Sequence, residues 1–115
     1  MLREDIKILS TDHIAQVLDR AEAIVEVPEW GGAVKLRAMT LEQRDAIMAQ
    51  AKGPDGQLDG QRLVRLLVLN GIVEPMLTEA ILAERAFGVI DRLANEVMKL
   101  NGMVKEAALT ASRTF

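Results

Sequence analysis

The chain contains 115 residues, half of them hydrophobic, and carries a formal net charge of −3 from 14 basic and 17 acidic side chains. This length suits one domain, and the apolar content is sufficient for a core, which excludes an intrinsically disordered chain. Acidic and basic residues are interspersed, so no basic block indicates binding to nucleic acid or to an anionic membrane. The lack of cysteine excludes disulfides and thiolate metal sites.

No apolar stretch is long enough to cross a bilayer, and the N-terminus lacks the apolar segment of a secretory signal. We therefore expect one soluble, cytosolic domain over residues 1–115, with residues 1–9 frayed. The first predicted element is a helix over residues 12–22, preceded by three possible capping residues at positions 10–12. Its apolar side chains have the i, i+3, i+4, i+7 spacing of a core-facing stripe. This stripe consists of Ile14, Val17, Leu18 and Ala21.

The next segment is the only one that clearly predicts β-structure. Apolar and polar residues alternate on both sides of a turn signal, as is typical of two half-buried strands. Pro28 cannot donate to a strand ladder and ends the first strand, while Gly31 and Gly32 permit the reversal. We predict one antiparallel hairpin near residues 23–38, with Trp30 at its tip or its root. The residues expected on its core-facing side are Val25, Val27, Val34 and Leu36.

Helical periodicity then dominates the sequence. Thr40 and Gln43 have the spacing of a capping box before a predicted helix over residues 41–51. The sequence Gly-Pro-Asp-Gly at residues 53–56 is a strong turn signal that ends this helix. A further helix begins near Asp59 and has apolar residues nearly all around it, so we expect it to be central and buried on most sides until an Asn-Gly stop.

Three more helices are predicted, over residues 79–86, 87–100 and 104–111, the first of them capped by Thr78. The predicted fold class is α+β: a mostly helical single domain with about five or six helices and one hairpin. The side chains expected to point inward from helices 41–51, 79–86 and 87–100 are Leu41, Ile47, Met48, Ala51, Ile81, Leu82, Phe87, Ile90, Leu93, Val97 and Leu100.

Residues for catalysis or metal binding are sparse. His13 is the only histidine, and one histidine cannot build the usual zinc sites. Asp55, Gln57 and Asp59 imitate the start of an EF-hand loop, but Leu66 stands where the bidentate glutamate belongs. A polar turn and a helix cap explain them better. Without a convergent catalytic constellation we predict a protein that is not an enzyme and that needs no metal or cofactor.

The two helices on either side of Gly71 leave open a second class of function, a small helical DNA-binding regulator. In a helix-turn-helix the second helix, here residues 79–86, would enter the major groove. It carries Glu79 and Glu84 against Arg85 alone, whereas recognition helices present cationic and amide side chains. We therefore expect no nucleic-acid partner and keep this regulator as the alternative.

Some apolar residues are candidates for a partner or self interface. Methionine fills irregular cores, but it also lines surfaces that accept varied apolar partners. Met76, with Leu77, and Met103 lie near predicted chain turns, where both interpretations stay open. Trp30 is either the core plug of the hairpin, which we favour, or an exposed anchor for a partner.

The hairpin sequence resembles a signature of the tail assembly chaperones of long-tailed, siphovirus-like bacteriophages and prophages. The signature residues are Val27, Pro28, Glu29, Trp30, Gly31 and Gly32. Weaker similarities are Thr11-Asp12-His13-Ile14, Glu42-Gln43-Arg44-Asp45 and Leu100-Asn101-Gly102. The likeness covers about residues 9–107. It departs from the family at residues 72–77, which lack the glycine-containing turn of many relatives.

The resemblance implies a non-enzymatic role in tail morphogenesis. Such chaperones bind and solubilise the tape measure protein, recruit tail tube protein, and are absent from the mature virion. A longer form made by ribosomal frameshifting typically shares the N-terminal part, and this chain looks like the short form. The expected location is the bacterial host cytoplasm, and the expected state is a homo-oligomer, because apolar binding surfaces tend to pair when the partner is absent.

Overall fold

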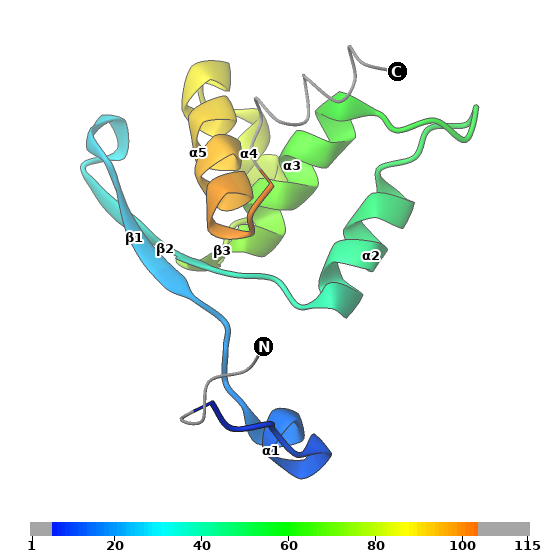
Figure 1. Cartoon of the computed structure of the whole chain (residues 1–115). Coiled ribbons are helices and arrows are strands. Elements are labelled where there is room, and N and C mark those ends of the chain that lie inside the picture. Colours follow the sequence, from blue (N-terminus) through cyan, green and yellow to red (C-terminus); the bar gives the residue numbers. More distant parts are fainter. Residues whose placement is uncertain (1–5, 104–115) are drawn as a thin grey trace.

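The computed structural model describes residues 6–103, which form an α+β domain with five α-helices and a three-stranded antiparallel sheet (Figure 1). The predicted fold class is therefore confirmed. The helix predicted over residues 104–111 lies outside the described residues. The helices are α1 (Thr11–Gln16), α2 (Leu41–Gln50), α3 (Gly60–Gly71), α4 (Glu79–Ala83) and α5 (Phe87–Leu100). The strands are β1 (Glu22–Val27), β2 (Gly32–Arg37) and β3 (Ile72–Glu74), in the order β1-β2-β3.

The predicted hairpin is confirmed, because β1 and β2 pair antiparallel in continuous register from Glu22 opposite Arg37 to the turn. On the outer face these two residues form an ion pair at 2.7 Å between Arg37 Nη2 and Glu22 Oε2, and the hydrogen bond from Arg37 lowers the pKa of Glu22. Alternation turns the other face towards the helices, as predicted. The buried residues there are Val27, Val34 and Leu36, with Val25 packed against them.

The third strand was not predicted. Helix α3 ends at Gly71, at the expected Asn-Gly stop, and the chain then passes directly into β3. Ile72 lies opposite Leu36 of β2, both of them buried, and Glu74 lies opposite Lys35 with a register shift in between. Strand β3 therefore lengthens the hairpin into a sheet and joins it to the helical layer.

The core lies between one face of this sheet and helices α3 and α5. Helix α5 contacts β1 and β2, whereas α3 contacts β3, α4 and, most extensively, α5. The two long helices approach closely at Gly71, because a side chain there would overlap Val97 of α5. Among the described residues, the largest side chains with almost no exposed surface are Leu36, Leu67, Leu93, Val27, Val68 and Val97.

The caps and turns read from the sequence are confirmed. Thr40 and Gln43 form the complete capping box of α2, and the Ser10 hydroxyl accepts a hydrogen bond from the His13 backbone at the start of α1. The Thr78 hydroxyl accepts from the Ile81 backbone in the same way. Gly102, with φ 71°, follows the end of α5 as expected. Local hydrogen bonding thus fixes where these helices begin and end.

Several predictions about burial and helix length were wrong. The helix predicted over residues 12–22 ends at Gln16, because Val17 adopts an extended conformation, and its apolar stripe faces solvent. The helix predicted over residues 79–86 ends at Ala83. Three residues predicted to point inward are exposed, namely Leu41 by 73%, Ile81 by 45% and Phe87 by 77%. The central helix α3 is also more open than expected, since Leu63, Val64 and Leu69 are only partly buried.

Candidate functional site

The signature residues form the tip of the hairpin. Pro28, Glu29 and Trp30 make one 3₁₀ turn between β1 and β2, and Gly31 follows with φ 78°. This left-handed conformation strains any residue with a Cβ, so the first glycine of the pair is the one that the turn requires. Trp30 is half-buried and packs against the core cluster. It is therefore neither a fully enclosed plug nor a free anchor.

The tip is held to helix α5 by a bidentate ion pair. Arg92 Nη1 donates to Glu29 Oε2 at 2.7 Å, and Arg92 Nη2 donates to Glu29 Oε1 at 2.8 Å. These hydrogen bonds, together with a backbone hydrogen bond, lower the pKa of Glu29 from 4.5 to about 2. The paired geometry fixes the orientation of the hairpin tip relative to α5, although both side chains are partly exposed.

We expect this ion pair to make the hairpin tip sensitive to acid. Because the pKa of Glu29 is lower in the folded chain, its contribution is present above pH 4.5 and is lost as the pH falls towards about 2. The stability difference between the wild type and Glu29→Gln, measured by denaturant unfolding, should be constant near neutral pH and shrink below pH 4.5. Glu26→Gln, on the outer face of β1, is the control. If the stability difference between the wild type and Glu29→Gln does not change with pH, the Glu29–Arg92 ion pair does not hold the hairpin tip as described.

The four candidate interface residues lie in three separate connections. Trp30 is at the hairpin tip, Met76 and Leu77 lie between β3 and α4, and Met103 follows α5. Met76 is 89% exposed, whereas Leu77 packs against the core. Met103 is half-buried, and its backbone donates to the Met98 carbonyl at 2.6 Å. Met76 is therefore the candidate whose side chain is open to a partner.

A groove not predicted from the sequence opens between α3, α4 and α5. It has a volume of about 1010 Å³ and an apolar floor. Val64 of α3, Leu82 of α4 and Ile90 of α5 line it, and the exposed ring of Phe87 stands at its edge. Arg65, Glu79 and Arg85 bring charges of both signs to its walls. Three successive helices build this groove, which we call the helical groove.

A second unexpected feature is the segment before the sheet, residues 6–20, which we call the N-terminal arm. None of its residues is buried, and it includes α1, which projects from the rest of the chain (Figure 1). Leu18 is 98% exposed. The other large apolar side chains exposed along the arm are Ile6, Ile8, Leu9, Ile14 and Val17.

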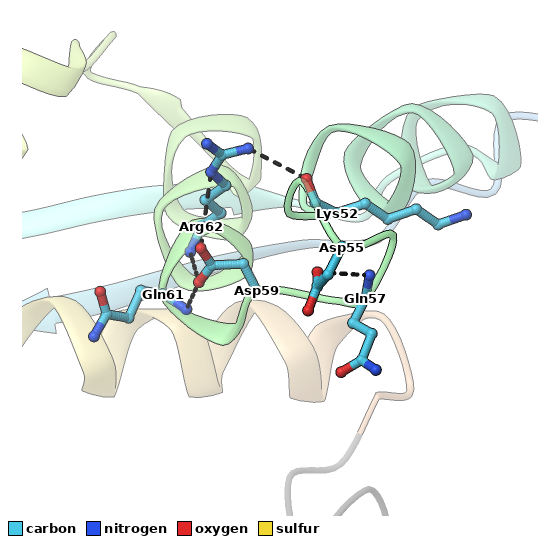
Figure 2. Close-up of polar contacts among 6 residues, drawn as sticks. All are labelled: Lys52, Asp55, Gln57, Asp59, Gln61 and Arg62. Atoms are coloured by element: carbon cyan, nitrogen blue, oxygen red, sulfur yellow. Dashed lines mark hydrogen bonds and ion pairs between the residues drawn. The ribbon is translucent and has the colours of Figure 1, made fainter.

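The EF-hand-like residues form a polar turn and a helix cap, as preferred from the sequence (Figure 2). Asp55 Oδ1 accepts from the Gln57 backbone at 3.0 Å, and Asp59 Oδ1 accepts from the Gln61 and Arg62 backbones. Their carboxylates are thus engaged with the backbone. Within residues 6–103, no group of three or more His, Cys, Asp or Glu side chains is arranged to hold a metal ion.

Over the same part of the chain, no polar or charged side chain is buried. Helix α4, which corresponds to the recognition helix of the alternative function, contains Glu79 and no basic residue. None of the described helices is both long and apolar enough to cross a membrane. Comparison with protein-family models, with curated proteins and with solved structures finds no match to this chain.

Proposed function

We propose that this protein is a non-enzymatic tail assembly chaperone of a long-tailed bacteriophage or prophage, which binds the tape measure protein and keeps it soluble. Under this proposal it acts in the cytoplasm of the bacterial host, helps to recruit tail tube protein together with a longer frameshifted form of itself, and is absent from the mature virion. The similarity of the hairpin sequence to that family supports the proposal, and its residues 27–32 form a defined tip rather than an irregular loop.

The observation that carries the proposal is the exposed apolar surface around α4, which we call the α4 surface. It consists of Met76, Ile81 and Phe87, exposed by 89%, 45% and 77%. These three side chains lie within twelve residues of sequence, and exposed apolar surface of this kind is typical of a binding site where it is contiguous. Methionine adapts to different neighbours at little cost because its side chain is unbranched and flexible.

The chemistry of the partner explains why such a surface is useful. A long helix with an apolar stripe aggregates in water unless the stripe is covered. A chaperone that tube subunits later displace must cover it through many weak and similar contacts. A small set of adaptable side chains on each copy, repeated along an extended helix, meets that requirement better than one deep and specific pocket.

Co-expression with the tape measure protein tests the proposal. The partner to use is the long helical reading frame expected next to this gene. We expect it to remain soluble and to co-purify with the wild-type chain, and to become less soluble with Met76→Lys, because a charge would be desolvated at the contact. Ile24→Lys, on the outer face of the sheet and 66% exposed, is the matched control.

The choice of Met76 for this test follows from burial. Met103→Lys would also insert a charge at a half-buried position, so lost solubilisation could reflect damage to the fold. Met76→Lys and Ile24→Lys should both unfold like the wild type. If the tape measure protein is equally insoluble with and without the wild-type chain, and does not co-purify with it, the proposed function is wrong.

A further inference from the structure

The N-terminal arm and the helical groove are two exposed apolar features of the same chain, and neither covers the other. The arm exposes large apolar side chains at six positions between residues 6 and 18. The helical groove exposes Phe87 and has an apolar floor formed by Val64, Leu82 and Ile90. Each feature is the chemical complement of the other, because a short amphipathic segment is what an apolar groove between helices binds.

Within the described part of the chain, the short helix of the arm lacks the tertiary packing that would stabilise it. Helix α1 has six residues, and helices of that length are marginal in water without tertiary packing. Its cap, in which the His13 backbone donates to Ser10 Oγ at 3.1 Å, fixes where it begins but supplies no packing. Among the described residues the arm has no buried side chain, so its apolar side chains are suited to pack against another chain.

The arm is anchored at the far end of the molecule from the helical groove. Arg20 Nε donates to the Ala38 carbonyl at 2.9 Å, and Arg20 Nη2 donates to Gln43 Oε1 at 3.0 Å. The Ala38 backbone in turn donates to the Ala21 carbonyl at 2.7 Å. Figure 1 shows α1 at the lower end, whereas the N-terminal ends of α3 and α5, which border the groove, are at the upper end.

We propose that the N-terminal arm of one copy binds in the helical groove of a second copy of this chain. Charges on the two features are compatible with this pairing. The arm carries Lys7, Asp12, Asp19 and Arg20, and the groove lining carries Asp59, Arg65, Glu79 and Arg85, so each feature offers two charges of each sign for oppositely charged pairs. This inference needs no tape measure protein, and its test is separate from that of the proposed function, although Phe87 belongs to both the α4 surface and the helical groove.

The number of contacts between two copies determines the kind of assembly. A pair that uses one arm and one groove leaves the other arm and groove free, so such head-to-tail contacts continue until a ring closes or an open chain forms. Two antiparallel copies that exchange both arms close as a dimer instead. The wild type should therefore associate as its concentration rises, and the size of the species distinguishes these two arrangements.

Sedimentation velocity with full-length variants tests the arm–groove contact. Leu18→Asp removes apolar character from the arm, and Phe87→Asp removes it from the groove edge; the two side chains are 98% and 77% exposed, so both variants should fold. We expect each variant to be monomeric at concentrations at least tenfold above those at which the wild type associates. Ile24→Asp, on the outer face of the sheet, should associate like the wild type.

Mixing the two variants gives the decisive result. Leu18→Asp retains an intact groove and Phe87→Asp retains an intact arm, so an equimolar mixture contains one functional contact per pair. We expect a heterodimer that grows no further. A mixture that stays monomeric, or a wild type that is monomeric at high concentration, would overturn the proposal.

Disulfide trapping identifies the occupant of the groove directly, because the native chain has no cysteine. Mixed under oxidising conditions, L18C and F87C chains should form a covalent heterodimer. A single chain that carries both F87C and L109C tests whether residues 104–115 of the same copy fill the groove instead. Formation of that intramolecular disulfide, without a heterodimer in the L18C and F87C mixture, would overturn the proposal.

Discussion

Replacing Gly71 with alanine is expected to lower the free energy of unfolding by about 2–3 kcal/mol, as overpacking of a core does. A Cβ at this position would lie 2.5 Å from Val97 Cγ2 and 2.6 Å from Val97 Cγ1. Val97 has no exposed surface, so its branched side chain cannot move into solvent. Either α3 and α5 separate or Val97 leaves its preferred rotamer, and both changes disturb the contact between the two longest helices.

The sign of this effect is what makes the experiment informative. Alanine in place of glycine in a helix ordinarily stabilises by about 0.5–1 kcal/mol, because the unfolded chain loses freedom. Gly88→Ala in α5, where a Cβ meets nothing within 4 Å, is the matched control and should be neutral or slightly stabilising. In the double variant with Val97→Ala, part of the loss should be recovered. Denaturant unfolding that shows Gly71→Ala to be as stable as the wild type would contradict the close approach.

The elements that the sequence predicts well are those specified by local signals. The bounds of α5 match the predicted helix over residues 87–100, and the capping box at Thr40 marks the start of α2. The hairpin follows from alternation on both sides of Pro28, which ends β1. In each case the hydrogen bonds that end the element come from residues within a few positions, so the local sequence is sufficient.

Strand β3 was not predicted because the local sequence contains no signal for a strand. It has three residues and directly follows α3, so the sequence after the Asn-Gly stop predicts only a short connection to the next helix. What makes these three residues a strand is the free edge of β2, which supplies partners from a distant part of the sequence. A strand of this length has no periodicity of its own by which to recognise it.

The N-terminal arm shows the opposite case: its sequence has a clear helical apolar pattern, but no described part of the chain covers the apolar side chains. Ile14, Val17 and Leu18 have the spacing of a core-facing stripe, yet each is exposed. Periodicity shows that a segment has an apolar side, but not whether its own chain covers that side. The same spacing is expected of a segment that binds another molecule. The proposed arm–groove contact explains the pattern in this way.

The candidate site was only partly predictable for related reasons. Met76 was singled out from its place near a turn, and it is the most exposed of the interface candidates that the structure describes. Phe87 was expected to point inward, but it is the first residue of α5 and its side chain is exposed. The helical groove combines three elements, so no single stretch of sequence reveals it.

Replacing Leu93 with alanine is expected to lower the free energy of unfolding by about 3 kcal/mol, within the range found for buried leucines. Leu93 has no exposed surface and belongs to the core cluster between the sheet and the helices. The loss combines the transfer free energy of the removed atoms with a cavity, because the neighbours cannot collapse fully. Chemical denaturation should show a lower midpoint with little change in slope.

Leu41→Ala is the matched control, because it removes the same atoms from a leucine that the sequence also predicted to point inward. Leu41 is 73% exposed at the start of α2, so little apolar surface is returned to water on unfolding. We expect its effect to be within about 0.5 kcal/mol of zero, as for other surface substitutions. If the two variants lost equal stability, the first turn of α2 would have to be packed like the centre of α5. The contrast between two leucines with the same predicted role therefore tests the packing of the core rather than the composition of the chain.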